Sequence, residues 1–119
     1  MDHICMTVPV LPGKTAAARA FMQDLDGPRR AEFDASERRI GITKELWYLA
    51  TAPGGDLLVG YMEAASFGDA LGMFVSSRDP FDMWFKDEFH AVTGVDLNNP
   101  PPDLAPAELL SHYEAGVAV

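Results

Sequence analysis

Only three side chains in this sequence titrate near neutral pH without special surroundings: His3, His90 and His112. His90 lies with Trp84 in the most aromatic segment of the chain, PFDMWFKDEFH. The Asp79-Pro80 pair before this segment predicts a break between two helices, which leaves a gap beside the sheet. We expect any activity to depend on His90 as the catalytic residue, with Trp84 and Tyr61 as walls of the site. The alternative is that Trp84 belongs to the core and His90 to the surface.

A second group of candidates is His3, Glu63 and His112. If they lie on adjacent strands, a histidine–carboxylate–histidine group can bind a metal or relay a proton. Their spacing matches no metal-binding signature, and polar residues are normal near strand ends. We therefore expect no metal site, and no cofactor.

A flat aromatic ligand needs ring faces and a few hydroxyl or imidazole groups around it. Trp47, Tyr61 and Tyr113 offer such groups, although they can equally be packing residues. The residues we expect to bind a ligand are Trp84, Tyr61, Trp47 and His3. If the pocket lies elsewhere, the next candidate is the barrel interior beside His3, Cys5 and Thr7.

Motifs for phosphate binding and for nucleophilic catalysis are absent. The run Pro12-Gly13-Lys14-Thr15 resembles the end of a phosphate-binding loop, but Val8 occupies the position of the required first glycine. There is no G-x-S-x-G elbow. We interpret Cys5, within an apolar strand, as a buried and unreactive thiol.

The composition limits the class of protein. The 119 residues include 48% apolar residues and carry a formal net charge of −9. One domain of this size builds its own core, and its acidity disfavours nucleic acids and membrane surfaces as partners. The single cysteine excludes an internal disulfide, and no signal peptide or membrane span is evident. We expect a cytoplasmic protein.

These candidates must be positioned by strands and helices, which the hydrophobic periodicity predicts. Strands are expected at 3–8, 45–50 and 57–63, with the turn Ala52-Pro53-Gly54-Gly55-Asp56 between the last two. Helices are expected at 14–25, 29–40, 66–77 and 81–92. A last strand is predicted at 108–113, although a helix also fits there.

This order predicts a single-domain α+β protein over residues 1–119, with the ferredoxin-like βαββαβ arrangement. Right-handed crossovers place the helices on one face of an antiparallel four-stranded sheet. Leu46 and Tyr48 alternate with Trp47 and Leu49, so the second strand is apolar on both faces. Since strands of this kind are buried on both sides, we expect a homodimer that covers the second face.

The element order, the early Pro-Gly-Lys and the two-sided sheet resemble the dimeric α/β-barrel superfamily. The run GITKELWYLATAPGGDLLVGYMEA followed by SSRDPFDMWFKDEF is similar to uncharacterised members related to antibiotic-biosynthesis-type monooxygenases. Haem-degrading relatives use an Asn, a Trp and a His, of which Trp84 and His90 supply two types. No Asn occurs in the first strand, so the haem-degrading type is the less favoured interpretation.

Two functional hypotheses follow. The first is a small homodimeric protein that binds an apolar or aromatic molecule in a cleft between helices and sheet, without catalysis. The second, implied by the resemblance, is a cofactor-independent monooxygenase or isomerase. The sequence does not identify the ligand.

Overall fold

The computed structural model describes residues 1–102 and 104–116. Along the chain the elements are β1 (Asp2–Pro9), α1 (Thr15–Asp26), α2 (Arg30–Ile40), β2 (Ile42–Ala52), β3 (Gly55–Ala64), α3 (Phe67–Ser76) and α4 (Pro80–Thr93). The first seven predicted elements are confirmed, with ends that differ by a few residues. No helix in the described part of the chain is long and apolar enough to cross a membrane.

The three strands form an antiparallel sheet in the order β1-β3-β2. In the register of this sheet, Gly60 in the central strand lies between Met6 of β1 and Trp47 of β2. The hairpin between β2 and β3 closes at the pair Ala52 and Gly55. Gly55 has a φ of 130°, which a residue with a side chain rarely adopts.

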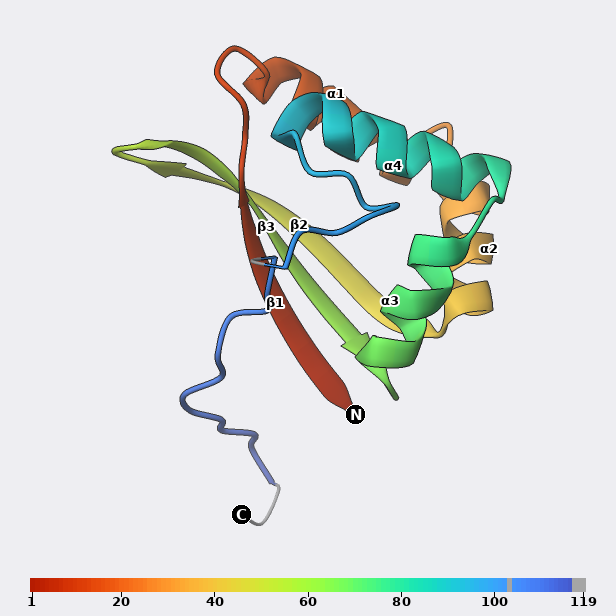
Figure 1. Cartoon of the computed structure of the whole chain (residues 1–119). Coiled ribbons are helices and arrows are strands. Elements are labelled where there is room, and N and C mark those ends of the chain that lie inside the picture. Colours follow the sequence, from red (N-terminus) through yellow and green to blue (C-terminus); the bar gives the residue numbers. More distant parts are fainter. Residues whose placement is uncertain (103, 117–119) are drawn as a thin grey trace.

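All four helices lie on one side of the sheet (Figure 1). Helices α1 and α4 run side by side, and the ring of Phe21 meets the ring of Phe85 edge to face between them. Both rings pack over Leu58 of β3 in the larger part of the core. A smaller cluster, around Met62 and Phe67, joins α3 to the same face of the sheet.

The helix boundaries follow from local signals in the sequence. Helix α2 ends at Gly41, which is left-handed with a φ of 91°. Helix α4 begins with Asp79 as its N-cap, whose carboxylate accepts a hydrogen bond from the Phe81 N–H, and with Pro80 in its first turn. These signals place α3 and α4 at an angle to one another, as the Asp79-Pro80 break predicts.

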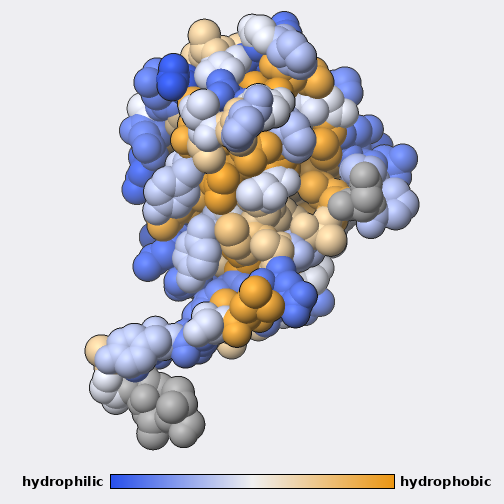
Figure 2. Space-filling model, turned by 90° about the vertical axis from the view of Figure 1, so that its left-hand side faces the viewer, coloured by the Kyte–Doolittle hydropathy of each residue, from blue (hydrophilic) through white to orange (hydrophobic). Residues whose placement is uncertain are grey.

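The opposite face of the sheet carries no helix. Leu46 and Tyr48 point to this face and are 42% and 57% exposed. Trp47 and Leu49 point to the helices and pack against the core, so the predicted alternation is confirmed. Figure 2 views the molecule from the left of Figure 1, and apolar residues form a band across this side.

The predicted fourth strand at 108–113 does not form among the described residues. After Leu97 the chain runs through Pro100, Pro101 and Pro102, and residues 104–114 are irregular. One backbone hydrogen bond, from the Ala107 N–H to the Cys5 carbonyl, joins this segment to the free edge of β1. Since proline lacks the donor that a strand ladder needs, this proline-rich run shortens the contact with β1. The sheet described here therefore has three strands and not four.

Candidate functional site

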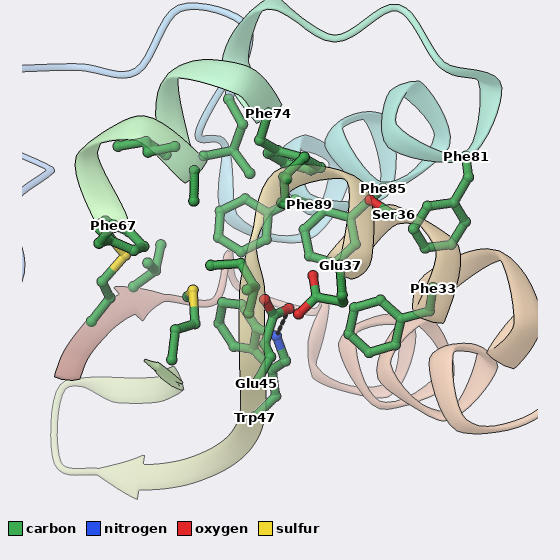
Figure 3. A pocket seen from close by; sticks show the side chains of 18 of the residues that line it. Phe33, Ser36, Glu37, Glu45, Trp47, Phe67, Phe74, Phe81, Phe85 and Phe89 are labelled. Atoms are coloured by element: carbon green, nitrogen blue, oxygen red, sulfur yellow. Dashed lines mark hydrogen bonds between the residues drawn. The ribbon is translucent and has the colours of Figure 1, made fainter. Parts of the chain in front are cut away.

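A cavity lies between the helices and the inner face of the sheet (Figure 3). Its volume is about 70 Å³, which is room for several water molecules. Its wall is almost wholly apolar. Seven aromatic side chains line it: Phe33, Trp47, Phe67, Phe74, Phe81, Phe85 and Phe89. We call this space the inner cavity.

Helical periodicity and strand alternation explain how these side chains converge. Phe81, Phe85 and Phe89 recur every four residues on α4, so they share the face that meets the sheet. On β2, Glu45 and Trp47 have the parity that points inward. The inner cavity is therefore bounded mainly by helices and strands, with Leu97 and Leu104 of the segment after α4 completing its wall.

Two carboxyl groups interrupt this apolar wall. Glu37 projects from α2 and Glu45 from β2, and they meet inside the cavity (Figure 3). The two groups lie close enough for one to donate a hydrogen bond to the other when it is protonated. Glu45 also accepts a hydrogen bond of 2.8 Å from the indole Nε1 of Trp47. A pair of acids in such surroundings is unusual, because burying charge without a cation is costly.

The surroundings raise the pKa of both groups. Desolvation, followed by the proximity of Glu45 and Asp82, raises the pKa of Glu37 to about 9. Desolvation also raises the pKa of Glu45, although the donors on Trp47 and Glu37 oppose it. Because both pKa values are raised, the pair retains a proton near neutral pH, and the two carboxyl groups share it. Near neutral pH the cavity thus holds a neutral acid beside a group that can accept a proton.

Gly60 allows the indole of Trp47 to lie flat against the sheet. A Cβ atom at position 60 would lie 2.7 Å from Cζ3 of Trp47, which is closer than such atoms approach. The indole in turn contacts the ring of Phe89, at 5.9 Å between centroids. The missing side chain of Gly60 therefore fixes the ring whose N–H binds Glu45.

A third acid, Asp82, lies on α4 and has no exposed surface. Its carboxylate accepts hydrogen bonds from the hydroxyls of Ser36 and Ser77 and from Arg39, whose Nη2 lies 2.6 Å from Oδ2. Burial alone would raise the pKa of Asp82, but these donors outweigh it and lower the pKa. Asp82 is therefore an ionised group that joins α2 and the end of α3 to α4.

The inner cavity adjoins a wider and more polar hollow on the outside of the molecule, which we call the outer hollow. It spans about 720 Å³ on the same measure. Phe33, Glu37, Ile42 and Glu45 border both spaces. The carboxyl pair thus stands at the junction between an apolar interior and a solvent-filled exterior.

The residues predicted from sequence do not meet in one place. Trp47 lines the inner cavity, but His90, Trp84, Tyr61 and His3 do not. His90 is exposed near the end of α4. Trp84 packs between Phe21 and Phe81, with the Arg29 guanidinium 4.1 Å from its ring centre.

Tyr61 and His3 lie on the outer face of the sheet. The Tyr61 hydroxyl donates a 2.6 Å hydrogen bond to Glu63, and the rings of His3 and His112 are 6.0 Å apart. Within residues 1–102 and 104–116, no three His, Cys, Asp or Glu side chains are arranged to hold a metal ion. Cys5 on this face is partly exposed, so its expected burial is wrong.

Sequence reasoning missed Glu37 and Glu45, although a signal for both was present. Glu37 lies on the same helical stripe as Phe33 and Ile40. Glu45 shares the parity of Trp47 and Leu49 in a strand predicted to be apolar on both faces. An acid on an apolar stripe is the informative exception to look for.

Two comparisons found no relative of this chain: no family model matches it, and no curated protein matches it. Solved structures do resemble it. An L-rhamnose mutarotase from Formosa agariphila is 12% identical, with a TM-score of 0.63 over 96% of this chain and 100% of that one. Tetracenomycin F2 cyclase from Streptomyces glaucescens, a type II polyketide cyclase, is 17% identical, with a TM-score of 0.57 over 97% and 99%. At these identities the likeness shows the α+β fold, which agrees with the predicted ferredoxin-like class.

Proposed function

We propose that this chain is an enzyme of the isomerase or cyclase kind, which binds a flat, apolar small molecule in the inner cavity and moves a proton on it. The observation that carries the proposal is the carboxyl pair Glu37 and Glu45 in an otherwise apolar, aromatic cavity. Pairs of acids whose surroundings assign them different protonation states are the usual means of acid–base chemistry at neutral pH.

The lining determines the kind of ligand. Aromatic walls favour a flat apolar molecule, because rings stack or meet edge to face at low cost. The solved neighbours are named a mutarotase and a cyclase, and neither name is that of an oxygenase. This supports the isomerase alternative over the monooxygenase alternative.

The two acids take different roles in this proposal. Glu45, which accepts hydrogen bonds from Trp47 and Glu37, removes a proton from the ligand. Glu37, with its pKa of about 9, donates a proton to a neighbouring atom of the same ligand. No other reactant is needed for such a transfer, since the proton removed and the proton added balance.

A simple probe tests the proposed base. In 5-nitrobenzisoxazole, removal of the acidic C–H proton lets that electron pair form a nitrile as the ring N–O bond breaks, which releases a coloured phenolate. We expect the protein to accelerate this reaction over acetate at equal pH. Glu45→Gln should slow it by about a hundredfold, the usual contribution of a positioned general base.

The matched control is Glu32→Gln, an exposed acid on the same helix as Glu37. It should leave the rate unchanged. If Glu45→Gln folds and is as fast as the unaltered protein, Glu45 is not a base and the proposal fails.

We also propose that a second copy of the chain covers the outer face of the sheet. The support is the exposure of Leu46 and Tyr48 on a face without helices. Leu109, Leu110 and Tyr113 are also exposed, in the segment that follows the hydrogen bond between Ala107 and Cys5. Sedimentation at micromolar concentration should show a dimer, and Tyr48→Lys should weaken it. A folded monomer at that concentration would contradict this part.

A further inference from the structure

The outer hollow differs in character from the inner cavity that it adjoins. Besides the four shared residues, its lining includes three basic side chains, Arg30, Arg38 and Lys44. The chain as a whole is acidic, with nine basic and eighteen acidic residues. Five of those nine fall within sixteen positions, 29–44: Arg29, Arg30, Arg38, Arg39 and Lys44. Arg29 and Arg39 lie outside the hollow, and Asp26 and Asp34 line it beside Arg30 and Arg38. The cations of this opening are therefore two arginines with exchangeable partners and Lys44.

These basic groups can exchange their present partners for a ligand. Arg30 and Arg38 each form an ion pair with an aspartate four residues earlier in the chain. Arg30 Nη1 lies 3.2 Å from Oδ1 of Asp26, and Arg38 Nε lies 2.9 Å from Oδ2 of Asp34. All four side chains are more than half exposed, and exposed pairs of this kind contribute little to stability. Lys44 makes no ion pair with the residues that the structure describes.

We propose that the outer hollow is a binding subsite for an acidic group, so that the natural ligand is an aromatic acid with its rings in the inner cavity and its anionic group among Arg30, Arg38 and Lys44. This rests on the proposed function, since it assumes that the inner cavity binds a flat apolar molecule. The further proposal names the chemical class of that molecule, an aromatic acid, and its orientation, with the acidic group toward the outer hollow.

The sizes of the two spaces support this division. The inner cavity is small, about 70 Å³, whereas the outer hollow spans about 720 Å³. A cavity of about 150 Å³ is needed to hold one benzene ring, so even a small aromatic ligand must extend past Glu37 and Glu45 into the polar space. The atoms at the junction of ring and acidic arm then lie beside the carboxyl pair, so the proton transfer occurs there.

Two dyes that differ by one acidic group provide the test. 8-Anilinonaphthalene-1-sulfonate is a flat aromatic anion, and N-phenyl-1-naphthylamine is the same molecule without the sulfonate. We expect the protein to bind the sulfonate more tightly than the neutral dye at low salt, and the difference should shrink as salt is added. The double variant Arg38→Gln, Lys44→Gln should weaken the sulfonate about threefold to tenfold and leave the neutral dye unchanged.

Arg19→Gln on α1, an exposed cation outside both spaces, is the matched control and should change neither dye. Equal binding of the two dyes, or an equal loss for both in the double variant, would overturn the acidic subsite. In that case binding of the neutral dye still supports the inner cavity. If neither dye binds, the subsite and the proposed function fail together.

Discussion

Two buried acid sites lie back to back on helix α2, and they are in opposite states. Ser36 points to Asp82, which is ionised, and the next residue, Glu37, points to Glu45, with which it shares a proton. Asp82 has no exposed surface, whereas Glu37 and Glu45 are half-buried and border the outer hollow, so burial alone cannot explain why Asp82 is the ionised one. What differs is the number of donors, because Asp82 has two hydroxyls and a guanidinium whereas the pair has a single indole N–H besides its own proton.

The comparison shows how one helix serves structure and chemistry at once. A fully satisfied carboxylate such as Asp82 holds helices together, and it has no capacity left to react. A poorly satisfied pair such as Glu37 and Glu45 adds little stability, but it keeps a proton that can be exchanged. Asp82 also acts on Glu37 directly, because its negative charge is one cause of the raised pKa of Glu37.

Removing Asp82 should have the largest effect. Asp82→Ala leaves Arg39 and two hydroxyls facing an apolar gap, so we expect a loss of about 3 kcal/mol in the free energy of unfolding. Urea unfolding followed by circular dichroism measures it. The control is Asp79→Asn, which keeps the cap of α4 and removes only a 3.6 Å contact with Arg39. A comparable loss in both variants would mean that Asp82 has no special structural role.

The pH dependence of stability should come next. The folded pKa of Glu37 is raised from 4.5 to about 9, so the unfolded chain releases this proton first as pH rises. The contribution of Glu37 to the free energy of unfolding is therefore greatest below about pH 4.5, and this contribution is lost as pH rises to 9. We expect the free energy of unfolding to decrease over that range, with a slope of at most about 1.4 kcal/mol per pH unit.

Glu37→Gln separates this effect from other titrations. The amide can still donate to Glu45 but cannot ionise, so the variant should be more stable than the unaltered protein at pH 8.5 and its pH profile should be flatter. Asp82 acts in the opposite sense and only in acid, because its lowered pKa means that its contribution is lost below about pH 3.8. An unchanged slope in Glu37→Gln between pH 5 and 9 would show that Glu37 is ionised in the folded protein.

Filling the space beside Trp47 should have a smaller effect, directed at the pair alone. Gly60→Ala pushes against the indole and should cost about 1–2 kcal/mol through overpacking. It should also separate Nε1 from Glu45, which the fluorescence of Trp47 in a Trp84→Phe background can follow. Gly72→Ala is the control, since a Cβ there meets nothing within 4 Å and alanine favours the helix. If the fluorescence of Gly60→Ala is unaltered, the ring does not depend on Gly60.

The smallest effect should come from Trp47→Phe, which keeps a ring and removes the donor. Loss of this hydrogen bond should cost about 1 kcal/mol and raise the pKa of Glu45 further, because Trp47 is one of the two groups that oppose its rise. Carbon NMR of labelled glutamate side chains measures that pKa. A lowered pKa would contradict the assignment of Trp47 as donor to an ionised Glu45.

Much of the fold could be predicted because periodicity and turn chemistry agree in most of the chain. Pro80, Gly41 and the Pro53-Gly54 turn mark ends that the structure retains. The segment 108–113 could not be decided in this way, since Leu109, Leu110 and Tyr113 fit a strand as well as a helix, and a strand forms only if a neighbouring edge is reached in register. The described part of this segment makes one backbone hydrogen bond with β1, at Ala107.

The site could be predicted less well, for a physical reason. Histidines and aromatic residues are natural candidates in a sequence because they can react or bind ligands without special surroundings, whereas glutamates are usually solvated on the surface. The reactivity of Glu37 and Glu45 comes from their burial against each other in the folded chain. They are eight residues apart, one on a helix and one on a strand, and their meeting can be predicted only when the turn at Gly41 is known. Of the residues predicted to form the site, Trp47 alone lines the inner cavity. The alternation predicted that Trp47 and Leu49 share a face but not that this face meets the helices.

The free edge of β1 has a consequence for how this protein behaves in concentrated solution. An open strand edge is a template on which another chain can add, and repeated addition leads to fibres or amorphous precipitate. Here the proline at position 9 ends the strand, the aspartate at position 2 places a charge at its start, and the 107–116 segment crosses the remaining length with one bond. Colloidal stability thus depends on a segment held to β1 by one backbone hydrogen bond, and removing that segment would expose the strand edge.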